Sequence, residues 1–443
     1  MRRELRAMLG LSLPVILAEL GWVMMGVVDT IIVSPLGPAA IGAVGSGSSL
    51  LFSIYVLGMG TLFALDTFVS QAYGAGRIDE CHRWFFAGLN VAAVLSVVLI
   101  GLGLGVVGAI GHAGIHPDVI VLLQPYLRAL LWSLPPLLAY TVFRRYLQAM
   151  NSVLPVTIAF VTANIINAAG NYALIFGYFG FPKLGVVGSA YATFAARILL
   201  ALFLLVAILY RERRSPSGFH DVGWTLDLPR MWRIARLGFP AAGQLTLEVG
   251  VFAAASMLAA RISPMALAAH QIVLHVASVL FMIPYGLSSA AAVRVGQAVG
   301  RGDAHGRRVA GWAAITIGLI FTGVTSVLLV VMPESFLRLF TTDASVLAVG
   351  AVLLLFYALC QPLDALQVVA TGALRGVGDT RTPMLANLIG HWGIGLPIAY
   401  YLCFSRSWGV EGLWTGLCIG LAIIGTFLAD VWRRASSTNS TAP

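Results

Sequence analysis

The stretch WFFAGLNVAAVLSVVLIGLGLGVVGAI, residues 84–110, contains no Asp, Glu, Lys or Arg. An α-helix needs about 20 mostly apolar residues to cross the hydrocarbon core of a bilayer. Residues 84–110 are therefore long enough to span a membrane. Polar and turn residues divide the rest of the chain into similar apolar segments, at approximately 11–33, 41–70, 119–141, 153–177, 186–210, 237–260, 266–293, 310–332, 346–373, 383–404 and 409–431. The sequence predicts an all-α polytopic membrane protein with twelve transmembrane helices.

The composition of the whole chain excludes a water-soluble fold. Of the 443 residues, 10% are charged and 59% are apolar, and the mean hydropathy is +0.90. An average soluble domain has about a quarter of its residues charged. The formal charge of +9 does not indicate a nucleic-acid partner, because isolated arginines between apolar runs form no basic face. The cysteines show no paired spacing, and we expect all four to be free thiols: Cys81, Cys360, Cys403 and Cys418.

The basic residues are unevenly divided between the two sides of the predicted membrane. With the N-terminus inside, 21 of the 27 Lys and Arg residues fall on the cytoplasmic side, Arg144 and Arg145 among them, and four fall outside. Arg128 and Arg197 remain within spans. The positive-inside rule therefore predicts a multi-pass protein of the plasma (inner) membrane with both termini in the cytoplasm.

The chain repeats itself at an offset of 226 residues. This offset aligns Pro14 with Pro240, Pro38 with Pro264, Gly60 with Gly286, Gln71 with Gln297, Gly74 with Gly300 and Gly76 with Gly302. Because the offset covers six spans, an even number, both halves have the same orientation in the membrane. We therefore predict two pseudo-symmetric six-helix lobes related by an axis along the membrane normal, with alternating access by rocking of the lobes.

The polar stretches suggest where these lobes begin and end. We expect an N-terminal lobe at residues 1–210, a cytoplasmic linker at residues 211–236, a C-terminal lobe at residues 237–434 and a disordered tail at residues 435–443. Arginines at helical spacing within residues 229–236 fit either a short interfacial helix or a solvated basic loop.

Five acidic residues fall within spans: Glu19, Asp29, Asp66, Glu248 and Asp364. An ionisable group at mid-bilayer costs about 2.5–3.5 kcal/mol or more, so each needs a partner, a cavity or a function. Arg128 and Arg197 are candidate partners. We expect Glu19 and Asp66 to have no coupling role, because both lie near the cytoplasmic ends of their spans.

The acids of the second half lie among polar side chains at helical spacing. Asp364 shares a face of its predicted helix with Gln361 and Gln367. Gln244 precedes Glu248 by one turn, and the following span presents Gln271 and His275. Together these residues predict an oxygen-rich pocket in the second lobe, suited to a proton or to sodium held by Glu248 and Asp364.

Asp29 is the candidate coupling residue of the first half. The fifth span carries Asn164, Asn167 and Asn171 at three- and four-residue steps, which places the three amides on one helix face. This amide face fits either a binding site shared with Asp29 or hydrogen bonds between helices. At the repeat offset the acids are not duplicated, which suggests a separate role for each lobe.

Several motifs resemble the multidrug and toxic compound extrusion (MATE) transporters, within them the NorM-like branch. They are VDT at 28–30, SQAYGAG at 70–76, RLGFP at 236–240, AAHQ at 268–271, RVG at 294–296 and DALQVVATGALRG at 364–376. The resemblance implies two six-helix lobes and export of organic, often cationic, compounds in exchange for sodium or protons. It places Glu248 and Asp364 at the second-lobe cation site, and Asp29, Asn167 and Asn171 at the first-lobe site. Some relatives have an aspartate at the position of Asn171, so this chain has one acid fewer there.

We therefore expect a secondary active multidrug exporter that acts as an antiporter for small organic cations or amphipathic drugs. Sodium or a proton would be the coupling ion, with no other cofactor, and the chain would act as a monomer. The alternative is a lipid or lipid-linked oligosaccharide flippase of the same superfamily, which would need basic residues for pyrophosphate where this chain has acids. An enzyme is disfavoured because the chain has no His-Glu-x-x-His or Gly-x-Ser-x-Gly motif.

Overall fold

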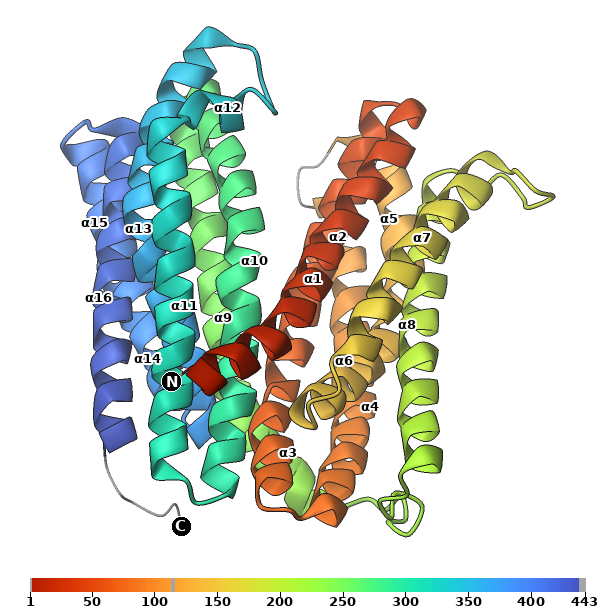
Figure 1. The fold of residues 1–443 in the computed structure, drawn as a ribbon. Helices are drawn as coiled ribbons and strands as arrows, with labels where there is room; N and C mark the ends of the chain where they lie inside the picture. Colours follow the sequence, from red (N-terminus) through yellow and green to blue (C-terminus); the bar gives the residue numbers. More distant parts are fainter. Residues whose placement is uncertain (1, 113–115, 438–443) are drawn as a thin grey trace. The chain divides into compact units, whose positions relative to one another are not determined.

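The computed structural model describes residues 2–112 and 116–437, and this part of the chain is helical without a strand. The helices of the first half are α1 (Arg2–Val33), α2 (Pro38–Leu62), α3 (Ala64–Gly74), α4 (Ile78–Ala109), α5 (Pro117–Leu131), α6 (Leu134–Ala149), α7 (Leu154–Phe176) and α8 (Val186–Arg214). Those of the second half are α9 (Leu228–Ile262), α10 (Pro264–Gly300), α11 (Ala304–Val331), α12 (Pro333–Leu337), α13 (Ala344–Val377), α14 (Arg381–Asn387), α15 (Leu396–Tyr400) and α16 (Gly409–Ser437) (Figure 1). Two π-helical segments, Leu388–Gly395 and Tyr401–Ser405, complete the span that α14 begins.

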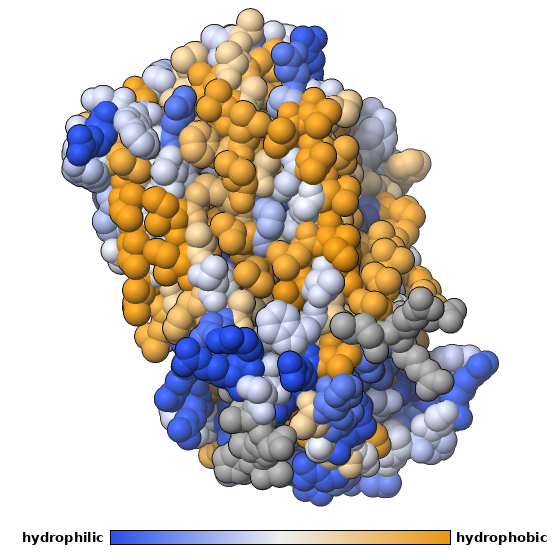
Figure 2. Space-filling model, turned by 60° about the vertical axis from the view of Figure 1, so that its left-hand side comes forward, coloured by the Kyte–Doolittle hydropathy of each residue, from blue (hydrophilic) through white to orange (hydrophobic). Residues whose placement is uncertain are grey.

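The number of spans agrees with the prediction from hydropathy. Within the described residues, eleven helical stretches are long and apolar enough to cross a membrane, and the number is twelve when the pair α5–α6, bent by 46°, is counted as one span. The bend falls where Pro135 and Pro136 begin α6, because proline donates no backbone hydrogen bond to the preceding turn. Apolar side chains cover much of the visible surface, with hydrophilic residues gathered toward one end (Figure 2). Val97, Val331 and Leu359 are each at least 70% exposed, as expected where lipid is the solvent.

The chain forms two compact units, one of residues 17–242 and the other of residues 1–16 with 243–443. The boundaries fall inside α1, after Ile16, and inside α9, after Ala242, rather than in the polar loop where we placed the linker. These two boundary residues are 226 residues apart, the offset of the sequence repeat. The opening turns of α1 and α9 therefore pack in the unit opposite to the rest of their own helix.

Glycines matched by the repeat allow this packing in each unit. A Cβ atom on Gly60 would lie 2.4 Å from the Cα of Ala242, and one on Gly286 would lie 3.1 Å from the Cα of Ile16. The two contacts join repeat-equivalent positions. Any larger residue at either glycine would force the helices apart, which explains why the repeat retains both glycines.

The region of the expected linker contains the end of α8, a loop and the start of α9. α8 extends to Arg214 and α9 begins at Leu228, so residues 229–236 are helical and continuous with the following span. In the intervening loop, the carboxylate of Glu212 accepts hydrogen bonds from the backbone N–H groups of Ser217 (2.7 Å) and Phe219 (3.1 Å). Trp224 Nε1 donates to Asn90 Oδ1 at 2.7 Å, which fastens the loop to α4. Of the predicted disordered tail, residues 435–437 end α16 and residues 438–443 lie outside the described residues.

Two expectations about individual residues are wrong. Cys360 and Cys418 form a disulfide between α13 and α16, with their Cα atoms 5.4 Å apart, whereas Cys81 and Cys403 are free and buried. Arg144 and Arg145 do not lie in a cytoplasmic loop. Both are buried within α6, because each has a carboxylate partner on another helix.

Candidate functional site

Three helices of the first unit bring polar side chains together around Asp29. Asn171 Nδ2 donates to Asp29 Oδ1 at 2.5 Å and to Asn167 Oδ1 at 3.2 Å. Thr193 Oγ1 donates to the other carboxylate oxygen, Asp29 Oδ2, at 3.3 Å. All four residues are buried. The structure thus joins Asp29, Asn167 and Asn171, which the sequence analysis selected, and adds Thr193 from α8.

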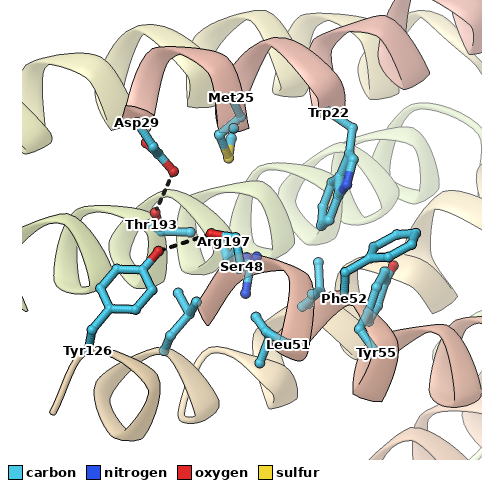
Figure 3. Close-up of a pocket in the computed structure, with 13 residues that line it drawn as sticks. Trp22, Met25, Asp29, Ser48, Leu51, Phe52, Tyr55, Tyr126, Thr193 and Arg197 are labelled. Carbon is cyan, nitrogen blue, oxygen red and sulfur yellow. Dashed lines mark hydrogen bonds between the residues drawn. The ribbon is translucent and has the colours of Figure 1, made fainter. Parts of the chain in front are cut away.

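Asp29 also lines a cavity within the first unit (Figure 3). The cavity measures about 90 Å³, which is room for several water molecules but well below the 300–1,000 Å³ typical of drug sites. Its walls are mostly aromatic and aliphatic, and the polar side chains that interrupt them are those of Asp29, Ser48, Tyr55, Tyr126, Thr193 and Arg197. Tyr126 is hydrogen-bonded to Ser48 across 3.1 Å. The cavity therefore suits a small ion, water or a single polar group of a larger solute.

Arg197 brings a positive charge to the same cavity. It follows Thr193 by one turn of α8, is 7% exposed and donates to Ser133 Oγ through Nη1. The centre of its guanidinium group lies 5.6 Å from the centroid of the Trp22 ring. Of the two candidate partners in spans, the other, Arg128, is exposed on α5.

The second unit holds Glu248 on α9 and Asp364 on α13, the two acids that the sequence analysis placed in one pocket. Glu248 is buried, and Gln244 precedes it by one turn on α9 and is also buried. Asp364 is partly exposed, so the pair can be reached from outside the unit. Among the described residues, no nitrogen of Lys, Arg or His lies within 4 Å of either carboxylate. The site is therefore acidic, and the described part of the chain gives it no basic partner.

The secondary candidates take other places. Gln361 accepts hydrogen bonds from Thr325 (3.0 Å) and Ser326 (3.3 Å) of α11. Gln367 donates to Asn387 at 3.2 Å, so both glutamines join helices. His275 is exposed and contacts the carbonyl of half-buried Gln271 in its own helix, and Asn164 likewise donates to the carbonyl of Phe160 in its own helix. The structure thus places His275 on the surface of its unit and gives Asn164 a local partner.

The remaining intramembrane acids are neutralised by arginine. Arg144 Nη2 donates to Glu19, and Arg145 Nη1 donates to both carboxylate oxygens of Asp66, at 3.0 and 3.3 Å. Each pair joins two helices, and loss of one partner of a buried ion pair is strongly destabilising. The structure thus separates the five acids into two that are paired and three that line or form polar sites.

Residues that the sequence analysis did not assign to the first-unit site are Ser48, Tyr126, Thr193 and Arg197. Arg197 could have been assigned, since it lies within a span that also contains Thr193 one turn earlier. Tyr126 and Ser48 gave no such signal, because serine and tyrosine are common in helices that contact other helices.

The two repeated units and their intramembrane polar sites define the class of the protein as a two-lobed membrane transporter. A family model described as MatE matches residues 14–173 and 240–401, and the chain belongs to this family. The two matches begin at Pro14 and Pro240, 226 residues apart, in register with the repeat.

Curated relatives and solved structures agree with this assignment. The chain is 33% identical to a probable multidrug resistance protein NorM of Mesorhizobium japonicum, covering 98% of this chain and 94% of that protein. It is 36% identical to the protein of the same description from Rhodopseudomonas palustris, over 98% and 92% of the two chains. The eukaryotic MATE transporter AtDTX14 has a similar fold, with a TM-score of 0.87 at 21% identity over 98% of this chain and 97% of that chain. An outward-facing multidrug resistance MATE family transporter has a TM-score of 0.89 at 18% identity, over 99% and 97%.

Proposed function

We propose that this protein is a secondary active multidrug exporter of the plasma (inner) membrane, with both termini in the cytoplasm. It exchanges small organic cations or amphipathic drugs from the cytoplasm for sodium ions or protons, acting as a monomer. Its relatives across nearly the whole length bear the name multidrug resistance protein, which supports transport of xenobiotics and not an enzymatic reaction.

The observation that carries the coupling mechanism is that the second unit holds two acids within its spans, Glu248 and Asp364, with no basic nitrogen within 4 Å of either among the described residues. A carboxylate in a low-dielectric site is costly to keep ionised without a cation. The alternative source of positive charge, an arginine, is supplied to Glu19 and Asp66 and is lacking within 4 Å of this pair in the described part of the chain. A proton or sodium ion therefore supplies the missing charge, and its arrival and release alter the charge of the second lobe by one unit.

Substrate and ion would then compete through this charge. When the carboxylate pair holds the coupling ion, an organic cation is less strongly attracted, which favours release outside. Loss of the ion toward the cytoplasm restores the negative charge and favours renewed substrate binding. The first-unit cluster around Asp29 supplies hydrogen-bonding groups for a polar part of the substrate.

A flippase for lipid-linked oligosaccharides is less well supported. Pyrophosphate recognition calls for exposed basic groups near mid-membrane, whereas the open site of the second unit is acidic. The relatives' names also favour drug export.

The experiment is drug efflux from proteoliposomes of purified full-length protein, with a sodium gradient and a proton gradient imposed in separate arms. Ethidium serves as the fluorescent organic cation. We expect one of the gradients to drive export by the wild type, and Glu248→Gln and Asp364→Asn to lose that response while keeping wild-type stability. The matched control is Glu411→Gln, since Glu411 is an exposed acid at the start of α16. Unchanged transport by both site variants would overturn the assignment of the coupling site.

A further inference from the structure

Arg197 is a charge inside the membrane that the proposed exchange of cations does not require. Its side chain lines the first-unit cavity, is more than nine-tenths buried and leaves Nε without a hydrogen-bond partner among the described residues. Its guanidinium group contacts Ser133 and the face of the Trp22 ring, both uncharged. No carboxylate oxygen of the described residues lies within 4 Å of it.

The charge of Arg197 cannot be removed by deprotonation. The guanidinium group keeps its proton in proteins, and an uncompensated cation in a low-dielectric site is costly. Of the residues that line the cavity, Asp29 alone carries a carboxylate. Asp29 and Arg197 line the same cavity, and Tyr55 and Tyr126 are the other titratable groups on its walls. Ionised Asp29 and Arg197 together make the cavity electrically neutral.

This neutrality distinguishes the first-unit site from the carboxylate pair of the second unit. A sodium ion or proton bound to Asp29 would give the cavity a net positive charge. The guanidinium group of Arg197 would repel that ion. The same ion at Glu248 and Asp364 meets two acids and, in the described structure, no arginine within 4 Å.

We propose that Arg197 is the internal counter-cation of Asp29 and a specificity-determining residue, which excludes the coupling ion from the first lobe and confines it to Glu248 and Asp364. This inference rests on the proposed function. Asp29 then remains ionised throughout the cycle, with Asn171 and Thr193 holding its two oxygens, and the exchange involves the second lobe only.

The test asks whether removal of Arg197 creates a cation site at Asp29. The purified full-length chain, reconstituted in lipid nanodiscs, carries Glu248→Gln and Asp364→Asn so that the second-lobe site is silent. Sodium-22 binding detects a bound sodium ion, and difference infrared spectroscopy of the carboxylic acid band detects a bound proton. We expect neither signal in this background, and one of them to appear on addition of Arg197→Gln and to disappear again on further addition of Asp29→Asn. Arg128→Gln, at the exposed arginine of α5, is the control and should add no signal.

Two results would overturn the proposal. One is a sodium or proton signal that is already present with Arg197 intact and is lost with Asp29→Asn. The other is the absence of any new signal when Arg197 is removed from a protein whose thermal unfolding is unchanged. Failure of the proposed function is a separate outcome, because it would appear as full gradient-driven efflux by the Glu248→Gln and Asp364→Asn protein, whatever the substitution at Arg197.

Discussion

The ion pair between Asp66 of α3 and Arg145 of α6 gives a quantitative test of how buried charge stabilises the first unit. Asp66 is fully buried and the Arg145 side chain is 3% exposed, with Nη1 of the arginine 3.0 and 3.3 Å from the two carboxylate oxygens. The guanidinium centre also lies 4.2 Å from the centroid of the Phe63 ring. We expect Asp66→Asn to lower the free energy of unfolding by about 3–5 kcal/mol, because it leaves a permanent buried cation without its counter-charge.

The size of the effect depends on which partner is removed. Arg145→Gln leaves a carboxyl group that can take up a proton and become neutral, whereas arginine cannot lose its charge. Asp66→Asn should therefore be the more damaging single substitution. The double variant, Asp66→Asn with Arg145→Gln, removes both charges and should recover to within about 1 kcal/mol of the wild type, as hydrogen-bonding amides replace the ion pair.

Thermal unfolding in detergent, followed by labelling of Cys81 in a Cys403→Ala background, measures this directly. Cys81 is fully buried on α4 and its thiol contacts the carbonyl of Val69 on α3 at 3.6 Å, so it becomes reactive when the packing of α3 opens. For a unit of this size, 3–5 kcal/mol corresponds to a midpoint lowered by roughly 6–20 °C. Asp430→Asn, at an exposed ion pair, should shift the midpoint little. A stable Asp66→Asn variant, or a double variant no better than that single one, would refute the reasoning.

Three further predictions concern packing, disulfide pairing and helix capping. Gly372→Leu should destabilise the second unit by about 1–3 kcal/mol or more, because a Cβ there would meet the backbone of α10 at 2.1 Å, whereas Gly101→Ala, where nothing lies within 4 Å, should be neutral in the same thermal assay. The disulfide of α13 and α16 predicts that denatured, unreduced protein shows two thiols reactive toward a maleimide polymer in a gel-shift assay, and reduced protein four; four before reduction would contradict the pairing. Hydrogen bonds from the side chain of Ser345 and from backbone N–H groups lower the pKa of Asp343, which caps α13. Its stabilising effect should therefore be present above about pH 4 and lost as the pH falls through the lowered folded value, so thermal midpoints of wild type and Asp343→Ala should converge in acid.

The spans could be predicted from hydropathy because each is a local property of about 20 residues. The same reasoning failed at the end of α6, where Arg144 and Arg145 looked like loop residues. Hydropathy over a short stretch of sequence shows that a charge within a span is costly. It cannot show a partner that lies 125 residues away, as Glu19 does from Arg144. The disulfide of Cys360 and Cys418 was missed for a similar reason, since 58 residues separate them and only the packing of α13 on α16 joins them.

At the candidate site, too, the sequence pattern predicted only part of the arrangement. Helical spacing placed Asn167 and Asn171 on one face of α7, and the structure brings that face to Asp29. Spacing could not show which face of α10 points inward, and His275 lies on the exposed side. Gln361 lies on the same helix face as Asp364 by its spacing, but its side-chain carbonyl oxygen accepts a hydrogen bond from Thr325 of α11.

The repeat explains why the two lobes can differ in charge without differing in fold. The contacts that shape each unit, Gly60 with Ala242 and Gly286 with Ile16, are close backbone approaches and involve no charge. Charged residues can therefore differ between the two units, provided that the buried charges of each unit are offset. One unit meets this condition with an acid and an arginine on the walls of one cavity. The other holds the acids Glu248 and Asp364, for which we propose a mobile cation, and the need for that cation would make the second lobe responsive to an ion gradient.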